Sequence, residues 1–449
     1  MSSSAVPAII VAEPESEAGV GAWLTLWVLV LVTLFAFLDR QMLALVTQPL
    51  GTSLRLTDGQ LGMIFGLGSA VFAMVATYPL GWLADRYDRR VVLGVCVMIW
   101  AGGTAACGFA NSYGTLFVAV LALSAGEAVV PPLTYSAIPD LFQGRQRVRA
   151  NHIFYVASIL SGAAGLILGG MASAAVEVSQ GFLPQSMHAL EPWRALFILV
   201  ALPAPLLIIL IASSQLHRRS TALTNTDSEA VPAAFGHYLA QHGRAIAIIF
   251  AALCAYGLPF GAILAWTPAA LERLFAANAT TTGIGIGIAL GGGCVVGVAA
   301  AGWLLSRLTP KLGVRASLRI ASWTLLGSLP VALFFPFVSN TIQAFASVAF
   351  LMLSGTLIGC LLPGIIQGLA PSQFRGRVTA IYSVISVITS GYGITAVGQL
   401  SDALASNPRS LLIAVTASLI LCWGVGAILL RLAEGPYERT LLAIGDATT

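Results

Sequence analysis

The sequence predicts an all-α membrane protein with twelve transmembrane helices in two pseudo-symmetric bundles of six. Three observations predict this fold. The chain of 449 residues is 57% hydrophobic and only 9% charged, which is far less charge than a soluble protein uses to cover its surface. Its apolar residues fall into runs of about 20 or more, the length that spans a bilayer. Short loop motifs also recur between the two halves of the chain.

The apolar runs and the polar breaks between them predict the helices in order. In the first half we expect helices at 22–46, 60–83, 91–110, 115–139, 150–176 and 194–213. In the second half we expect them at 244–272, 282–305, 316–338, 342–368, 377–402 and 410–431. The bundles then cover 22–213 and 244–431. The polar stretch 214–243 links them, residues 1–21 form an acidic cytoplasmic tail, and 432–449 form a second cytoplasmic tail.

The distribution of positive charge supports twelve spans with both termini in the cytoplasm. With that topology, seventeen of the 22 Lys and Arg residues lie in inside loops and tails, and four lie outside. Basic residues favour the cytoplasmic side of a membrane, so an odd number of spans would spoil the pattern in one half. Because the outer loops are short, we expect a multi-pass protein of a bacterial inner membrane.

An internal repeat indicates that each bundle is a version of the other. Gly81-Trp82-Leu83 with Arg86 recurs as Gly302-Trp303-Leu304 with Arg307, in the equivalent loop of the second half. Repeated halves are typical of secondary transporters, which bind substrate between the halves near the middle of the membrane. Two such halves make a monomer sufficient for function.

The loop GWLADRYDRR at 81–90 resembles the signature loop of the major facilitator superfamily, and the span count, linker and repeat fit that fold. The resemblance implies a cytoplasmic gate loop, in which Asp85 can accept hydrogen bonds from the amino end of a neighbouring helix. The loop would act as a latch between the halves, as a topology anchor, or as both. Asp88 departs from the pattern, which has glycine at that position. The gate residues are Gly81, Asp85, Arg86, Arg89 and Arg90.

Only three charged residues are expected near the middle of the membrane: Asp39 and Arg40 in the first helix and Glu127 in the fourth. An ionisable group at that depth is costly unless it faces a partner or a watery cavity, so such groups are usually functional. The cluster could exchange a proton, or pass Arg40 between a carboxylate and an anionic substrate. The alternative is a static salt bridge. Adjacent residues point about 100° apart on a helix, so Arg40 could serve Glu127 rather than Asp39.

The same residues narrow the family resemblance. Asp39-Arg40, the SAGEA segment at 124–128, and IPDLFQGRQRVRA at 138–150 are similar to the Spinster branch of the superfamily, mainly in the first half. Spinster proteins of animals export lipids such as sphingosine-1-phosphate or lysophospholipids. The resemblance implies that Asp39 and Glu127 couple transport to protons and that Arg40 binds the headgroup or takes part in coupling.

The second half offers an uncharged, partly aromatic wall. Thr356 occupies the position that corresponds to Glu127, and the wall is expected to contribute substrate contacts from Tyr256, Trp266, Thr356 and Tyr382. For any one of these aromatic residues, packing or contact with lipid is the alternative to a role in binding. The apolar glycine run at 283–297 favours close helix packing rather than a phosphate-binding loop.

The leading hypothesis is a proton-coupled secondary transporter that moves an amphipathic, lipid-like substrate by alternating access. One alternative is a proton antiporter for drug-like or small organic anions, and another is a membrane receptor or scaffold that does not transport. The sequence offers no nucleophile elbow, phosphate loop or metal-ligand set, so we expect no enzyme, no cofactor, no metal and no nucleic-acid partner.

Overall fold

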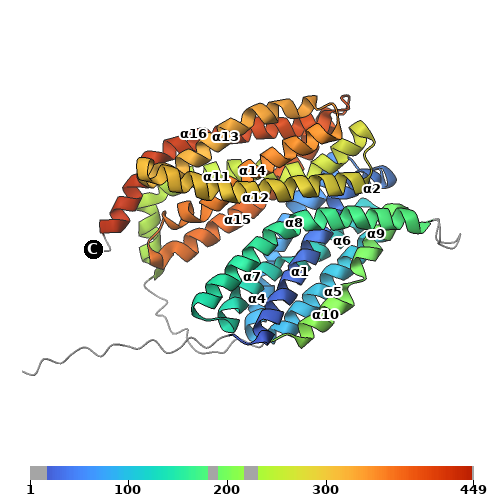
Figure 1. Cartoon of the computed structure of the whole chain (residues 1–449), viewed down its shortest axis with the longest axis horizontal. Coiled ribbons are helices and arrows are strands. Elements are labelled where there is room, and N and C mark those ends of the chain that lie inside the picture. Colours follow the sequence, from blue (N-terminus) through green and yellow to red (C-terminus); the bar gives the residue numbers. More distant parts are fainter. Residues whose placement is uncertain (1–17, 181–190, 217–230, 447–449) are drawn as a thin grey trace, which may run out of the picture.

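The computed structural model describes residues 18–180, 191–216 and 231–446, which form helices joined by short turns, without β-strands in these ranges. The helices form two bundles that lie side by side and diverge toward the end where α1 begins and α16 ends (Figure 1). We call this end the tail end. Most of the expected acidic tail and residues 217–230 of the expected linker lie outside the described residues.

The first bundle contains every described helix before the linker. Its elements are α1 (Val20–Leu45), α2 (Thr47–Leu54), α3 (Asp58–Gly62), the π-helical turn η1 (Met63–Gly68), α4 (Ser69–Arg86), α5 (Arg89–Gly108), α6 (Tyr113–Ala128), α7 (Val130–Leu141), α8 (Gly144–Gln180), α9 (Pro192–Ala201) and α10 (Ala204–Ser213). Three of its membrane spans are composite, because α3, η1 and α4 run on continuously, as do α6 with α7 and α9 with α10.

The second bundle uses fewer and longer helices. Its elements are α11 (Val231–Phe275), α12 (Ala279–Leu312), the 3₁₀ turn η2 (Gly313–Arg315), α13 (Ala316–Phe334), the 3₁₀ turn η3 (Phe335–Phe337), α14 (Thr341–Gln367), α15 (Ser372–Ala403) and α16 (Ser410–Asp446). At the η2 turn the chain reverses through Gly313, whose φ of 58° lies in the left-handed region that glycine adopts without strain.

The described residues contain eleven continuous helical stretches that are long and apolar enough to cross a membrane. One of them, Ala279–Phe337, is 59 residues long and contains both α12 and α13, which η2 separates. Figure 1 shows α12 and α13 as separate rods. The stretches therefore amount to twelve spans, as the sequence predicts.

Several helix ends differ from the sequence-based bounds. The fourth expected helix breaks at Val129, where Pro131 and Pro132 follow and lack the amide hydrogen of a continuous helix. The sixth breaks near Pro203 for the same reason. These breaks leave the spans in place.

Two segments that we expected to be polar connections are helical. α11 begins at Val231, inside the expected linker 214–243, and its Tyr238 is buried and donates a hydrogen bond to the Leu369 carbonyl oxygen. α16 continues beyond 431 to Asp446, through most of the expected tail 432–449. Tertiary contacts stabilise these extensions, because Glu438 of α16 forms an ion pair with Arg315 of η2, and Glu434 forms one with Arg319 of α13.

The bundles contact each other along two pairs of helices. α8 packs along α12, and α3 with η1 packs on α15. The glycine run of α12 serves close packing, as its apolar character predicts. A Cβ atom added to Gly283 would lie 2.6 Å from the Leu166 carbonyl oxygen, and one added to Gly287 would lie 2.8 Å from that of Ala163. We call the end where these contacts lie, opposite the tail end, the seal end.

Candidate functional site

Asp39 and Arg40 leave α1 in different directions. Asp39 is buried inside the first bundle, with 2% of its surface exposed, whereas the side chain of Arg40 is 62% exposed. Leu24 marks the outer face of α1, where it lines a groove with Leu210 of α10. The sixteen positions from Leu24 to Arg40 correspond to about 160° around the helix. The Arg40 guanidinium is therefore open to a ligand on the side away from that outer face.

Glu127 of α6 is the partner of Arg40. The Arg40 Nη2 atom lies 3.7 Å from Glu127 Oε2, and the Glu127 side chain is only 5% exposed. Among the described residues, Glu127 Oε1 and Asp39 Oδ1 are buried oxygens without a hydrogen-bond partner. The structure thus brings the three midplane charges together and leaves two carboxylate oxygens able to accept a proton or a hydrogen bond.

α5 backs this cluster with residues that the sequence analysis did not single out. Trp100 and Thr104 lie four residues apart on one face of α5, beside the buried Asp39 carboxylate. Gly126 lets α6 press against this face, because a Cβ atom added there would lie 2.7 Å from the Trp100 amide nitrogen. In the sequence, these residues could be recognised only as a Trp followed one turn later by a Thr in an apolar helix.

The gate loop is organised mainly within the first bundle. Arg89 is buried and donates a hydrogen bond to Asp140 Oδ2 at 2.7 Å, which ties the start of α5 to the end of α7. Arg90 pairs with Asp88 at 2.6 Å, and the Arg86 guanidinium lies 4.0 Å from the Trp82 ring.

Asp88 begins α5 as its N-cap, accepting a hydrogen bond from the Arg90 amide at 2.9 Å. Its φ of −61° needs no glycine, which explains why Asp can replace Gly in this loop. Gly81 has open space where a Cβ atom would lie, and Asp85 is exposed. The loop therefore anchors α5 in this arrangement, and its role as a latch between halves stays a prediction.

The seal end holds a polar lock between the bundles that the sequence analysis missed. Arg273 of α11 donates two hydrogen bonds to Asp58 of α3, from Nη1 at 2.7 Å and from Nη2 at 2.5 Å. Ser401 of α15 donates a third to Asp58 Oδ2 at 2.8 Å. Asp58 is buried, so these bonds replace the water that its carboxylate would otherwise hold.

Asp402 of α15 completes the lock from the second bundle. Its two carboxylate oxygens accept hydrogen bonds from the amides of Asp58 and Gly59, at 2.9 and 2.8 Å. These amides open the helix that begins with α3, where the backbone dipole favours negative charge. The sequence signal was Thr57-Asp58, a typical helix start, but the partner at 402 is set only by the tertiary structure.

Comparison with known protein families identifies the family to which this fold belongs. The model of the Major Facilitator Superfamily matches residues 29–394, which is most of the chain and includes the charged cluster and the gate loop. The chain belongs to the Major Facilitator Superfamily. It is therefore a membrane transporter rather than an enzyme.

Relatives within the superfamily are distant. An MFS-type efflux pump of Mycolicibacterium smegmatis is 24% identical over 94% of both chains. Protein spinster of Drosophila melanogaster is 29% identical over 36% of this chain and 27% of its own length. The sphingosine-1-phosphate transporter SPNS2 of Danio rerio is 27% identical over 30% of this chain and 27% of its own.

Solved structures agree with the fold. A bacterial homologue of the human lysosomal transporter Spinster, in an inward-facing and unoccupied conformation, superposes with a TM-score of 0.75 at 19% identity. The match covers 95% of this chain and 99% of that one. A D-xylose–proton symporter gives a TM-score of 0.70 at 14% identity, covering 90% of this chain and 97% of that one. The superfamily fold and the resemblance to Spinster proteins are confirmed.

The expected wall of the second half is only partly available to a substrate of this transporter. Tyr256 is buried and donates a hydrogen bond to the Gly355 carbonyl oxygen at 2.7 Å. Trp266 is also buried and donates to the Ile394 carbonyl oxygen at 2.9 Å. Both act as packing residues in this arrangement, because their polar atoms are already bonded inside the second bundle.

Thr356 and Tyr382 are only partly buried and stay candidates for substrate contact. The Tyr382 ring packs against Phe250, with ring centroids 5.6 Å apart.

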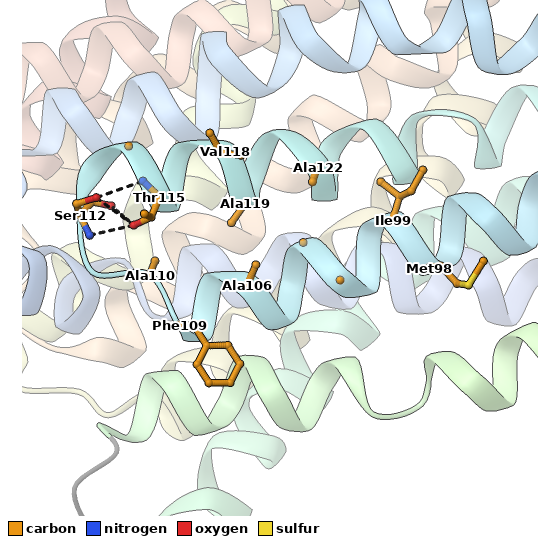
Figure 2. A pocket seen from close by; sticks show the side chains of 13 residues that line it. Met98, Ile99, Ala106, Phe109, Ala110, Ser112, Thr115, Val118, Ala119 and Ala122 are labelled. Carbon is orange, nitrogen blue, oxygen red and sulfur yellow. Dashed lines mark hydrogen bonds between the residues drawn. The ribbon is translucent and has the colours of Figure 1, made fainter.

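A groove of about 780 Å³ lies between α5 and α6 on the first bundle, apart from the charged cluster (Figure 2). Small apolar side chains such as Ala106 and Ala122 line much of it. Its hydroxyl groups, Ser112 and Thr115, bond to each other at the start of α6. The groove therefore differs in character from the charged cluster, because its lining is mainly apolar and its two hydroxyl groups are bonded to each other.

Proposed function

We propose that the chain is a proton-coupled secondary transporter that moves an amphipathic, lipid-like molecule with an anionic headgroup by alternating access. The observation that carries this proposal is the position of Arg40. Its guanidinium is mostly exposed, yet it lies 3.7 Å from a buried Glu127 whose second oxygen has no partner among the described residues. Such an arginine can exchange one anionic partner for another.

The ion pair is suited to exchange because it is loose. Charge-assisted hydrogen bonds between arginine and carboxylate are about 2.7–2.9 Å long, and the Arg40–Glu127 contact is well beyond this. A substrate phosphate or carboxylate can engage the planar fork of Arg40 through two parallel hydrogen bonds. Glu127 then loses its positive neighbour while it stays buried, and binding a proton removes the cost of its unpaired charge.

Asp39 supplies the second protonatable group of the proposed cycle. It is buried beside Trp100 and Thr104, and its charge interacts directly with that of Glu127. Two buried carboxylates beside a single arginine, which pairs with only one of them, carry an excess negative charge, and a single proton neutralises it. Substrate binding at Arg40 and proton binding at the acids are therefore linked by charge balance.

The proposed substrate class draws on the relatives as well as on the site. A Spinster relative of zebrafish is named as a sphingosine-1-phosphate transporter, and it matches 138 residues of this chain. A molecule with an anionic head and an apolar tail would suit Arg40 on one side and the uncharged second bundle, with Tyr382 and Thr356, on the other.

The orientation of the protein belongs to the same proposal. We place both termini in the cytoplasm of a bacterial inner membrane, because the basic loops cluster on that side. The tail end is then cytoplasmic, and the seal end faces outward. The two halves of one chain suffice to enclose a site between them, which supports a monomer as the working unit.

The test uses the full chain in proteoliposomes with an imposed pH gradient and a fluorescent lysophospholipid as probe. Asp39→Asn and Glu127→Gln should abolish gradient-driven accumulation while probe exchange without a gradient persists. Arg40→Ala should weaken probe binding at least tenfold, and Arg40→Lys should recover part of it, because lysine keeps the charge but loses the planar fork. Glu177→Gln, an exposed acid at the end of α8, is the matched control. Accumulation that survives both acid substitutions would refute proton coupling at these residues.

A second candidate substrate class is favoured by one observation. The relative that matches this chain along nearly its whole length is named as an efflux pump. A proton antiporter for drug-like anions would use the same Arg40 and the same acids. A competition experiment separates the two proposals. An excess of a hydrophilic aromatic anion would displace the lysophospholipid probe if the anionic group alone decides binding, which favours the antiporter for drug-like anions. Failure to displace the probe favours the lipid-like substrate.

A further inference from the structure

The π-helical turn η1 interrupts an otherwise α-helical span at the contact between the two bundles. It covers Met63–Gly68, between α3, which carries the Asp58 lock, and α4, which leads to the gate loop. A π turn bonds each amide to the carbonyl five residues back rather than four; such turns are rare, and they frequently occur at functional sites. The turn therefore needs a stabilising contact, and the second bundle provides one.

That contact is the hydroxyl of Thr395 of α15. It accepts a hydrogen bond from the Leu67 amide at 3.0 Å and donates one to the Gly62 carbonyl oxygen at 2.8 Å. Leu67 and Gly62 are five residues apart, so they are the two groups that a π turn would join directly. The hydroxyl of the opposite bundle bonds to both of these groups, and it stabilises the widened turn from outside the helix.

The same hydroxyl has a second acceptor in its own helix. Thr395 Oγ1 lies 3.1 Å from the Gly391 carbonyl oxygen, four residues back in α15. A hydroxyl has only one hydrogen to donate, so Gly62 and Gly391 compete for it. Donation to the carbonyl four residues back is the usual arrangement for a threonine in a helix. Thr395 can thus leave the other bundle without leaving its own hydroxyl hydrogen unbonded.

The short side chain of Thr395 reaches the turn only because the two backbones lie very close at this crossing. A Cβ atom added to Gly66 would lie 2.7 Å from Thr395 Oγ1, and one added to Gly62 would lie 3.1 Å from the Ile394 carbonyl oxygen. Any movement that separates the two helices at the seal end therefore breaks the hydrogen bonds of the Thr395 hydroxyl to Leu67 and Gly62. Those two groups must then bond within their own helix.

We propose that Thr395 is a positioning residue for alternating access, which stabilises the π turn η1 only while the seal end is closed. When the seal end opens, the hydroxyl returns to Gly391, and the turn relaxes toward α-helical bonding. Because the number of residues per turn changes, α3 and its Asp58 rotate relative to α4. The turn thereby links the state of the lock to the rest of the span. The inference rests on the proposed alternating access, but the behaviour of the turn can be measured without any substrate.

The experiment is hydrogen–deuterium exchange of the purified full chain, followed in peptides that cover residues 62–70. Thr395→Val keeps the shape of the side chain and removes the hydroxyl. We expect the Leu67 amide to exchange about five- to tenfold faster, the factor that corresponds to the loss of one ordinary hydrogen bond. Thr395→Ser keeps the hydroxyl and should restore slow exchange. Thr389→Val is the matched control, because the Thr389 hydroxyl donates to the Ile385 carbonyl oxygen of its own helix and not to the first bundle as far as the structure describes it.

A second variant probes the link with the lock and does not alter Thr395. Arg273→Ala weakens the closed seal end, so it should also speed exchange in 62–70, while peptides from the centre of α12 stay unchanged. Unchanged exchange in Thr395→Val, or equal changes in Thr395→Val and Thr389→Val, would overturn the inference.

Transport in proteoliposomes distinguishes this failure from a failure of the proposed function. A positioning role predicts that Thr395→Val lowers turnover several-fold with unchanged affinity for the lysophospholipid probe, and that Thr395→Ser transports as the original chain does. If the exchange results hold and no tested lipid is transported, the proposed substrate is wrong but the switch in the turn stands. If transport is found and exchange is insensitive to Thr395, the inference about the turn fails alone.

Discussion

Replacing Asp58 by asparagine removes the negative charge that Arg273 holds across the seal end, with little change in volume. Asp58 accepts two hydrogen bonds from Arg273 and one from Ser401, all within 2.8 Å. Every donor lies in the second bundle, so these bonds exist only while the seal end is closed. The substitution should therefore destabilise the closed seal end selectively, relative to a state in which that end is open.

The magnitude follows from the burial of the pair. Breaking a fully buried ion pair costs about 3–5 kcal/mol, and an exposed pair contributes about 0–1 kcal/mol. The Asp58 side chain is 8% exposed but that of Arg273 is 27% exposed, which places this pair between the two limits. We take about 2 kcal/mol, which shifts the equilibrium between the closed and open seal end about 30-fold.

The assay is the rate at which a charged, membrane-impermeant maleimide modifies a cysteine introduced at Ala70. Ala70 is half-buried at the crossing with α15, in contact range of Gly391, so the closed seal end limits access to the cysteine. Asp58→Asn should raise the rate by up to about 30-fold over the protein that carries Ala70→Cys alone. The chain without the Ala70 replacement gives the background from the six native cysteines.

Glu191 provides the matched control for this measurement. It pairs with Arg194 at 3.0 Å, but both residues belong to the first bundle, so Glu191→Gln should leave the modification rate unchanged. A rate that does not rise in Asp58→Asn would refute the assignment of Asp58 as a lock. An equal rise in both variants would show a general loosening of the protein rather than a specific opening.

Three further outcomes are expected. Arg89→Ala should lower the free energy of unfolding by about 2–3 kcal/mol, because a buried cation and its bond to Asp140 are lost. Arg90→Ala should lower it by less than about 1 kcal/mol, because its pair with Asp88 is partly exposed. Thermal denaturation in detergent compares the two variants, and similar losses would contradict the structure. Gly66→Ala should speed modification of the cysteine at position 70, since a Cβ atom would collide with α15, but Gly102→Ala, which has open space, should not. The pKa of Glu191 lies below its usual value of 4.5, mainly because Ser53 donates a hydrogen bond to it, with Arg194 adding to the effect. A lowered pKa in the folded state contributes stability that is present above about pH 4.5 and is lost as the pH falls through the folded-state pKa. The thermal stability of the original chain should therefore drop more steeply below pH 4.5 than that of Ser53→Ala, and parallel curves would exclude this contribution.

Sequence alone predicted the fold class because the membrane imposes a strong constraint. A chain with 57% hydrophobic residues and apolar runs of bilayer length can satisfy its backbone only in spanning helices, and the repeated loop motifs indicated two halves. The midplane charges Asp39, Arg40 and Glu127 could be identified for the same reason, since charge at that depth is rare in a spanning helix.

Helix ends were less predictable, because local polarity does not report tertiary contacts. Residues 434 and 438 look like a polar tail in the sequence, yet arginines of η2 and α13 pair with them, and α16 extends to Asp446. The wall residues Tyr256 and Trp266 showed the converse problem. Their side chains have the right chemistry for a binding site, but the second bundle buries them and satisfies their polar atoms.

The partners of each charge and the contact between the bundles were decided only by the tertiary structure. The direction of a helical side chain follows from its position, so the sequence could indicate that Arg40 turns away from Asp39. It could not indicate that Asp58 meets Arg273, that Asp402 meets the start of α3, or that Thr395 bridges the turn η1. Each of these pairs joins residues more than 200 positions apart. Their proximity depends on how the two bundles pack against each other and on which end of the molecule is closed.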